Sequence, residues 1–418
     1  MRYSKQVCRK AGLRLLVLVA CLVAASPPLH SQATSRAEEI RQRRIDKRAR
    51  IWPERTAGIT EMVSKFTERG LLEGAESGKG SNGLQFVPGG MRQGNGAAFG
   101  IGYRRVDLWG ERIAFRATAR GTLANSYMFD FEVGFPRFST ERGEITVYVK
   151  HENSPLMDYY GAGPNSSKSG RSSFRLEDTS ADLRLKYRLF GNLYVGASGG
   201  VYAPNTGPGK RKGFPSTDEI YDPAETPGLG AQPDFLRAAG TIQYDYRDLK
   251  TGPRSGGNYY TTFTRYWDQS LGRHTFSQLD SAVEQYIPYW NKTNVIALRL
   301  AAVSTWTKAG QQSVPFYLQP TLGGNYWLRG FNRFRFYDQN AILAAVEHRW
   351  HLFSGGHMAA FFEMGKVTQK ASQLNFHDLE YSGGIGFRFT IRDAVFMRID
   401  NAVSREGYRF MWTFDNIW

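Results

Sequence analysis

A short glycine-rich stretch carries the pattern of a known catalytic motif. Residues 196–200 read Gly-Ala-Ser-Gly-Gly, which satisfies the Gly-x-Ser-x-Gly pattern of serine hydrolases. In those enzymes the serine lies on a sharp turn between a strand and a helix, and the turn exposes its hydroxyl as a nucleophile. Here the motif lies inside Leu193 to Tyr202, a small-residue stretch typical of a strand, and no helical pattern follows it. We therefore expect Ser198 to be a strand residue and not a nucleophile.

Metal-binding and nucleotide-binding patterns are equally weak. His348 and His351 are three residues apart near an expected strand end, so they should point to opposite faces. The glycine run 94–100 has no helix behind it that could hold a phosphate. Both cysteines, Cys8 and Cys21, precede residue 30, which leaves the rest of the chain without a disulfide or a Cys-built zinc site. The sequence predicts no enzyme, no metal and no cofactor.

Composition excludes several further classes of protein. The chain has 418 residues and a formal net charge of +16. Aromatic residues make up 14% and recur along the chain, which excludes a disordered protein. A helical membrane protein needs about 20 apolar residues for each span, and the longest apolar run, 15–25, is much shorter. Because the basic residues are spread along the chain, they favour a positive lumen or rim over a nucleic-acid-binding surface.

From residue 82 onward, polar and apolar residues alternate with a period of two, which indicates β-strands. In the last segment every second residue is aromatic, and the residues between are mostly polar. The aromatic positions are Tyr408, Phe410, Trp412 and Phe414. A strand with lipid on one face and water on the other needs this alternation. A soluble β-sandwich would show it too, but aromatics this dense on a terminal strand would favour aggregation.

Sixteen strands can be marked between residues 84 and 418, and their connections alternate in length. Short turns are expected at 108–111, 139–143, 190–192, 290–292 and 354–356, and long loops near 154–173, 203–234, 309–338 and 367–379. Short turns at one rim and long loops at the other are typical of outer-membrane barrels. The pattern predicts an all-β protein: a transmembrane antiparallel β-barrel of about sixteen strands over residues 82–418.

One loop motif points to a family. Residues 328–331 read Leu328-Arg329-Gly330-Phe331, which resembles the motif at the tip of the sixth loop in the BamA/TamA outer-membrane assembly superfamily, the bacterial surface-antigen domain. In our strand assignment this loop is also the sixth on the long side, between strands eleven and twelve. The resemblance implies that the loop folds into the lumen, where its arginine meets acids of the inner wall.

Two acids are candidates for that partner. Glu347 lies on expected strand twelve, and Glu363 lies on strand thirteen. The segment from Phe361 to Gly365 resembles the family's Phe-x-Asp-x-Gly motif, with Glu in place of Asp; the side chain is one methylene longer but keeps its charge. A planar guanidinium binds carboxylates bidentately, so Arg329 is suited to pin the loop. In the alternative interpretation these groups are ordinary lumen charges.

Three weaker matches support the same resemblance. Residues 159–166 resemble the Gly-x-Gly-Pro loop of shorter members, and residues 246–257 resemble an Arg-Asp…Pro…Gly turn. The terminal Trp418, with Phe414 and Trp412 on the same face, resembles the signal that hands a barrel to the barrel-assembly machinery.

The N-terminus predicts export. Five basic residues, an apolar core at 15–25 and the segment Ser31-Gln32-Ala33 indicate a signal peptide over residues 1–33. A buried helix is the alternative, and a lipoprotein box ending at Cys21 is a second possible cleavage site. Residues 34–81 are expected to form a short basic periplasmic leader and linker, with no room for the periplasmic POTRA repeats of typical members.

The resemblance also implies a function. The first strand, about 84–92, should pair weakly with the last, about 408–418, because Pro88, Gly89 and Gly90 weaken a ladder. We expect this lateral seam to admit a protein strand or a lipid, so that the barrel assists insertion or translocation at the outer membrane of a Gram-negative-type bacterium. The alternative is a passive pore or structural barrel with loop six as a plug. Expected partners are outer-membrane lipids including lipopolysaccharide, an unfolded barrel or exported protein, and the assembly machinery. We expect a monomer that binds no nucleic acid.

Overall fold

The structure, a computed structural model, describes residues 82–414 apart from short gaps at 90, 139–141, 251, 291–292, 354 and 392–393. The expected signal peptide 1–33 and leader 34–81 lie outside the described residues, as do Gly90 and Trp418. No helix in the described part of the chain is both long and apolar enough to cross a membrane.

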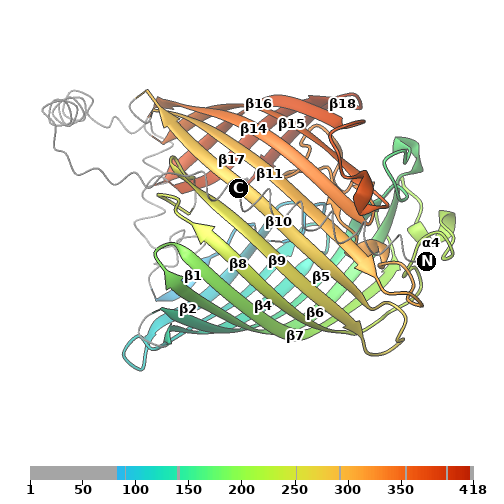
Figure 1. Cartoon of the computed structure of the whole chain (residues 1–418), viewed down its shortest axis with the longest axis horizontal. Coiled ribbons are helices and arrows are strands. Elements are labelled where there is room, and N and C mark those ends of the chain that lie inside the picture. The colour runs from blue at the N-terminus through green and yellow to red at the C-terminus, as the bar shows by residue number, and fades with distance from the viewer. Residues whose placement is uncertain are drawn as a thin grey trace, which may run out of the picture. The chain divides into compact units, whose positions relative to one another are not determined.

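Sixteen antiparallel strands form one sheet that curves into a barrel, with neighbours in chain order (Figure 1). The prediction of a sixteen-stranded barrel is confirmed. The strands are β1 (Gly83–Phe86), β2 (Ala98–Leu108), β3 (Ile113–Thr122), β4 (Tyr127–Phe138), β5 (Gly143–Tyr159), β6 (Ser172–Phe190), β7 (Leu193–Pro208), β8 (Phe235–Asp245), β9 (Gly256–Asp268), β10 (Phe276–Tyr289), β11 (Asn294–Thr307), β14 (Asn340–Phe353), β15 (Gly356–Thr368), β16 (Glu380–Ile391), β17 (Ala394–Ser404) and β18 (Gly407–Thr413).

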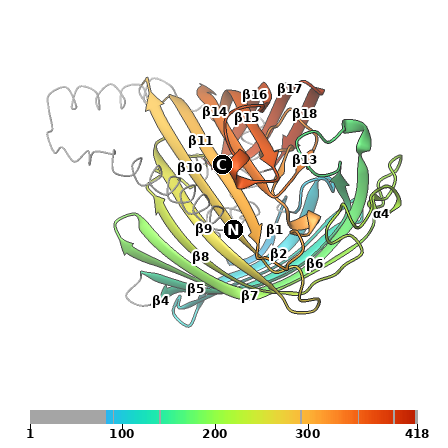
Figure 2. The ribbon, with the colours of Figure 1, turned by 45° about the vertical axis from the view of Figure 1, so that its right-hand side comes forward.

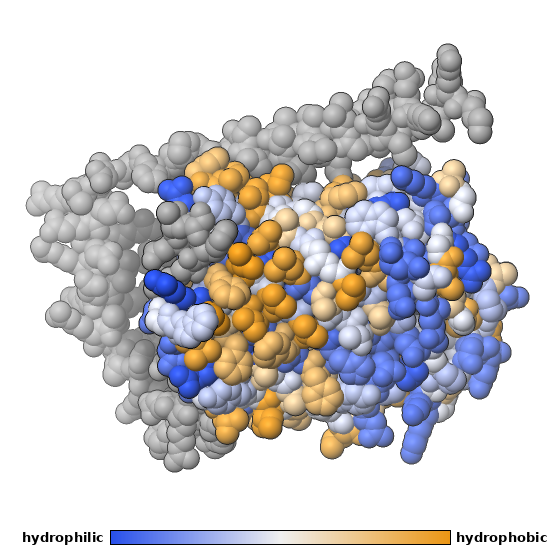
Figure 3. Space-filling view, turned by 90° about the horizontal axis from the view of Figure 1, so that it is seen from below, coloured by the Kyte–Doolittle hydropathy of each residue, from blue (hydrophilic) through white to orange (hydrophobic). Residues whose placement is uncertain are grey.

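Alternating side chains give the wall two chemically different faces. On β11, for example, Leu298 and Leu300 are exposed outward while Arg299 between them is buried inside. Apolar side chains cross the middle of the outer face, and polar ones gather toward the end that bears the long connections (Figure 3). Because the outer face meets lipid and the inner face meets polar groups, one alternating strand satisfies both.

The longest connections lie at one end of the barrel (Figure 1). Two short turns, from β3 to β4 and from β17 to β18, lie at that end too, and ten residues join β8 to β9 at the opposite end. Short turns join β2 to β3, β4 to β5, β6 to β7, β10 to β11 and β14 to β15, as predicted. The long connections at the other end carry α4 (Thr217–Ile220), the 3-10 turns η1 (Lys168–Gly170), η2 (Phe316–Leu318) and η3 (Ala371–Gln373), and a two-stranded sheet of β12 (Thr321–Leu322) and β13 (Phe336–Tyr337).

The first strand is shorter than predicted. β1 ends at Phe86, whereas the sequence suggested a strand over 84–92. Beyond it the backbone still follows β2, since Val87 N–H donates to the Gly100 carbonyl at 2.9 Å and Gly89 N–H to that of Ala98 at 2.8 Å. In an antiparallel ladder alternate residues face opposite neighbours. Position 88 therefore faces away from β2, toward the free edge, and proline has no N–H to offer there.

The two edges of the sheet meet at this point. A Cβ placed on Gly89 would lie 3.5 Å from the carbonyl oxygen of Phe414, which directly follows β18. The rings of Phe99 on β2 and Phe414 are 6.2 Å apart. Within the described ranges no strand ladder joins β1 to β18. The junction of β1 and β18 is here called the seam, and the residues that directly follow these two strands are in contact there.

Candidate functional site

Residues 308–339, called loop six, connect β11 to β14 and fold inside the curve of the sheet (Figure 2). Leu328 and Phe331 are fully buried in a cluster with Leu343 of β14 and Val367 of β15. Leu328 has a φ of +54°, a left-handed conformation that sharply turns the chain at the motif. The inward-folded sixth loop expected from the sequence is thus present.

Arg329 lies at the centre of this loop and has no exposed surface. Its Nε donates to Glu363 Oε1 at 2.8 Å, and its backbone N–H donates to the other oxygen of that carboxylate at 2.6 Å. Its Nη1 donates to Glu347 Oε2 at 2.9 Å. The guanidinium also lies over the ring of Phe361, 3.3 Å from its centroid. The structure therefore places Arg329 against both acids singled out in the sequence.

The pairing extends into a network that the sequence analysis missed. Arg388 of β16 donates to Glu347 at 2.9 Å and to Asp400 of β17 at 2.7 Å. Arg398 donates to the second oxygen of Asp400 at 2.5 Å, and Arg349 donates to Glu347 at 2.8 Å. With Arg329, these arginines and carboxylates form what we call the pin network, and all of its members are buried. Burial is tolerated because each charge has at least one charged partner and further hydrogen bonds, such as those of Arg398 to Asp400 and to the Asn325 carbonyl.

The sequence does contain a signal for Arg388 and Arg398, the two members of the pin network on β16 and β17. Arg388 lies between Phe387 and Phe389, and Arg398 lies between Met397 and Ile399. A charge flanked by apolar residues on a lipid-facing strand must point into the lumen. The pattern gives the face of each residue, but it does not reveal that Arg388 and Arg398 stand directly opposite each other on β16 and β17. Two like charges in register repel, and Asp400, bonded to both, offsets this repulsion.

Gly330 allows loop six to approach the wall closely. A Cβ at this position would lie 2.6 Å from the carbonyl oxygen of Val403 and 2.8 Å from the Cβ atoms of Ser382 and Ser404. Real Cβ atoms do not come this near, so the site accepts only glycine without a shift of loop or wall. In the strand-thirteen motif, Gly365 has the same role, since its Cβ would lie 2.5 Å from the carbonyl of Ile342.

Loop six is bonded to the last hairpin, β17 and β18, on one side of the seam. Ser404 Oγ donates to the Gly330 carbonyl at 2.8 Å. Arg409 of β18 donates to the Arg329 carbonyl at 3.1 Å and also to that of Phe331. Arg335 pairs with Glu406 in the hairpin turn at 2.7 Å. The backbone of the motif is thus held by the strand that forms one edge of the sheet.

The same loop is bonded to the connection that follows β1, on the other side of the seam. Asn325 N–H donates to the side-chain oxygen of Gln93 at 3.0 Å, and the Asn325 carbonyl accepts a hydrogen bond from Arg398 at 2.6 Å. Gly324 gives Gln93 the space to approach. One peptide segment, 324–325, therefore bridges β17 and the β1–β2 connection. We call this bridge the strap.

Two segments that gave weaker motif matches, 159–166 and 246–257, also form hydrogen bonds with loop six or the pin network. In the segment 159–166, the Gly163 N–H donates to the Tyr337 carbonyl at 2.7 Å, and Ser166 accepts a hydrogen bond from Arg335 at 2.8 Å. In the turn 246–257, the Pro253 carbonyl receives a bond from Arg349 at 3.5 Å. Motifs far apart in the sequence thus converge on loop six and the pin network.

Other residues singled out in the sequence lie elsewhere. Ser198 is inside β7, and the strand continues to Pro208, so the strand–turn–helix arrangement of a hydrolase is absent there. His348 and His351 both lie on β14, and no metal-ligand cluster is found in the described part of the chain. Trp412 points outward from β18. Of the three residues expected at the seam, Pro88 and Gly89 lie just beyond the end of β1, and Gly90 is outside the described residues.

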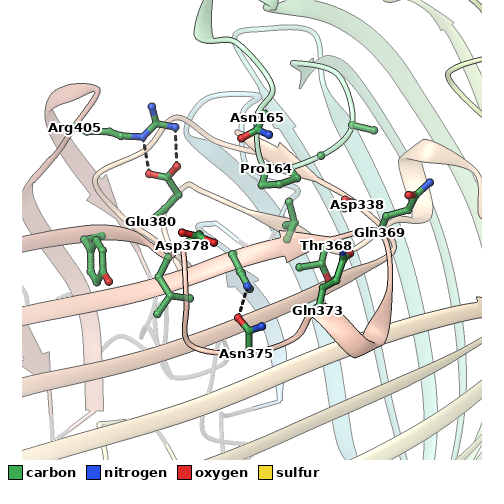
Figure 4. Close-up of a pocket in the computed structure, with 16 residues that line it drawn as sticks. Pro164, Asn165, Asp338, Thr368, Gln369, Gln373, Asn375, Asp378, Glu380 and Arg405 are labelled. Carbon is green, nitrogen blue, oxygen red and sulfur yellow. Dashed lines mark hydrogen bonds and ion pairs between the residues drawn. The ribbon is translucent and has the colours of Figure 1, made fainter. Parts of the chain in front are cut away.

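A separate polar cavity of about 1050 Å³ lies between the segment 162–165 and the connection from β15 to β16 (Figure 4). Its charged side chains are largely paired with neighbours. Arg405 Nε lies 2.6 Å from Glu380 Oε2, and Lys366 Nζ donates to Asn375 at 2.6 Å. This cavity therefore has a lining of both charge signs, and none of its lining residues belongs to the pin network.

Comparison with solved structures identifies the fold. BamA from Haemophilus ducreyi, lacking POTRA domains 1–3, superimposes with a TM-score of 0.58 and 13% identity, covering 86% of this chain and 77% of that one. The chain has the fold of a BamA-type barrel. CdiB from Escherichia coli matches with a TM-score of 0.50 and 13% identity, over 80% of this chain and 60% of CdiB. CdiB from Acinetobacter baumannii matches at 11% identity and a TM-score of 0.48, over 80% of this chain and 59% of that one. No protein-family model and no curated protein sequence matches the chain.

Proposed function

We propose that this BamA-type barrel lies in an outer membrane and assists the insertion or translocation of proteins, or of lipids, through the seam between β1 and β18. The observation that carries the proposal is the shortness of β1 beside that seam. β1 has only four residues, and Pro88 removes a donor on the side that faces the last strand. An incoming strand that offers a full ladder would gain hydrogen bonds that no described residues of β1 and β18 make with each other.

The strap sets a condition on opening. If β18 swings away from β1, the contacts of Ser404 and Arg409 move with it, whereas the Gln93 contact stays with the β1–β2 connection. Loop six cannot follow both sides, so some of these bonds must break first. We infer that loop six holds the seam closed until a substrate offers a better pairing.

The proposed partners follow from this arrangement. An unfolded barrel or exported protein would supply the strand, and lipids including lipopolysaccharide would surround the outer face, where apolar side chains are exposed. The chain itself would be inserted by the barrel-assembly machinery. Each of these partners rests on the proposed function.

A disulfide across the seam tests the proposal. A Cβ on Gly89 would lie 3.7 Å from the Cβ of Phe414, within the Cβ–Cβ range of about 3.5–4.5 Å for disulfides. A chain starting at residue 34 contains no other cysteine. We expect oxidised Gly89→Cys/Phe414→Cys protein in liposomes to lose the ability to speed the folding of a urea-unfolded outer-membrane barrel, followed by its heat-modifiable gel mobility. Reduction should restore the activity.

The matched control is Ala117→Cys/Phe131→Cys, at positions that pair across β3 and β4 inside the wall and not across the seam. Its oxidised form should keep full activity. Equal activity of the oxidised and reduced seam pair would refute lateral opening.

The second candidate is a passive pore or structural barrel with loop six as its plug. The observation in its favour is the complete burial of Leu328, Arg329 and Phe331 inside the lumen. This reading predicts that the oxidised seam pair behaves like the parent protein, and that no preparation speeds the folding of another barrel.

A further inference from the structure

Four arginines converge on a single carboxylate in the lumen, beside loop six. Arg171 donates to both oxygens of Asp158, at 3.2 and 3.1 Å, and Arg211 Nε lies 2.8 Å from the same carboxylate. Arg333 of loop six and Arg409 of β18 complete the group, which we call the arginine cluster. The charges of Arg171 and Arg211 act on Arg333, and those of Arg333 and Arg171 act on Arg409.

Two members of the cluster have no acid of their own. Arg409 donates to the carbonyls of Arg329 and Phe331, which are neutral. Arg333 makes no hydrogen bond or ion pair with any residue in the described ranges, and its buried Nε has no partner. Burial lowers the pKa of Arg333, the carboxylate of Asp158 raises it in part, and the charges of Arg211 and Arg171 lower it again.

Glu406, three residues before Arg409, already has a cation of its own, because Arg335 binds it at 2.7 Å. The cluster therefore holds three more positive charges than negative ones. A partly buried excess of like charge is unfavourable unless a counter-ion joins it.

We propose that Arg333 and Arg409 form a binding site for an oxyanion, and that its ligand is a phosphate group. Guanidinium groups bind phosphate through paired, charge-assisted hydrogen bonds. Arg171 and Arg211 are already bound to Asp158, so they add positive potential but few free donors. The site borders β18, so a phosphate reaches it either free in solution or on a lipid head group at the seam. The proposal is independent of whether the seam opens.

The test measures phosphate binding to the refolded barrel in a zwitterionic detergent. Isothermal titration with inorganic phosphate should show binding that weakens about tenfold or more in Arg333→Gln, the loss expected for one charge-assisted hydrogen bond. Arg333→Lys keeps the charge and should retain part of the affinity. Arg405→Gln is the control, because Arg405 is an exposed rim arginine paired with Glu380. Heat-modifiable mobility checks that each variant is folded.

A second arm identifies the source of the phosphate. Thermal unfolding is followed with lipid A and with dephosphorylated lipid A in the micelle. Stabilisation that needs both the lipid phosphates and Arg333 supports the site with a lipid ligand, and Arg333-dependent binding of inorganic phosphate alone supports it with a free ion. Equal binding by Arg333→Gln and the parent, or no binding in either arm, overturns the proposal.

Discussion

At the scale of single residues, the pin network is a set of buried charges that stabilise one arrangement of loop six. The Glu363 carboxylate accepts hydrogen bonds from the side chain and the backbone N–H of Arg329, and from the Ser382 hydroxyl at 2.9 Å. Burial lowers the pKa of Arg329, but the carboxylates of Glu363, Glu347 and Asp400 raise it well above its ordinary value. The guanidinium therefore stays charged at any pH at which the barrel is studied.

Charge reversal at this position tests the network. In Arg329→Glu, a fourth carboxylate would face Glu347, Glu363 and Asp400 without a cation of its own. Breaking one partner of a buried ion pair typically destabilises by about 3–5 kcal/mol. We expect a lower midpoint of urea unfolding and a higher single-channel conductance.

The double change Arg329→Glu/Glu363→Arg restores one opposite pair and should recover part of the stability, although the backbone bond from residue 329 is lost. Arg405→Glu is the control. It reverses the charge of an exposed arginine at the rim, and it should change the free energy of unfolding by at most about 1 kcal/mol. If Arg329→Glu behaves like Arg405→Glu, the network does not hold the loop.

At the scale of elements, the fit between loop six and the last hairpin depends on a residue without a side chain. Gly330 lies against β16 and β17 at distances that exclude a Cβ. Because Ser404 donates to the Gly330 carbonyl and Arg409 to the carbonyls on either side of it, a small displacement of the loop also strains the contact with β18. The register of loop six therefore determines how β18 is held at the seam.

Gly330→Ala should displace the loop. Overpacking of this kind costs about 1–3 kcal/mol, and we expect a lower unfolding midpoint together with unstable, larger channel currents. Gly240→Ala on β8 is the matched control, since a Cβ there meets nothing within 4 Å. If the unfolding midpoint shifts in Gly240→Ala, or does not shift in Gly330→Ala, the close approach of Gly330 to the wall is not what positions the loop.

At the scale of the whole molecule, the lumen is filled and positively charged. Loop six contacts both the inner wall, through Arg329, and the β1–β2 connection, through Asn325. Arginines without acids, such as Arg333 and Arg409, lie inside. Fixed positive charge in a narrow passage raises the local concentration of anions.

We expect a small steady current that prefers anions. In a tenfold KCl gradient, the sign of the reversal potential should show that chloride crosses more readily than potassium. Arg333→Gln should bring the reversal potential closer to zero. Cation selectivity in the parent protein would show that the described arginines do not line the conducting path.

Local patterns along the chain are enough to predict the barrel. Alternation of period two predicts sixteen strands and the face of nearly every wall residue, because each face of a membrane strand meets a different solvent. The motif at 328–331, through its resemblance to a known loop, also located the inward segment and two of its acidic neighbours. These are local signals, readable within about ten residues.

Which of the inward-facing groups meet depends on how the whole sheet curves. Asp400, Arg388 and Arg398 join the pin network because the curved sheet brings β14, β16 and β17 around one point, and no local pattern encodes that distance. The early end of β1 at Phe86 and the strap at Asn325 likewise depend on contacts with distant segments. Long-range convergence across a lumen is set by the curvature and register of the whole sheet, which single-strand patterns do not contain.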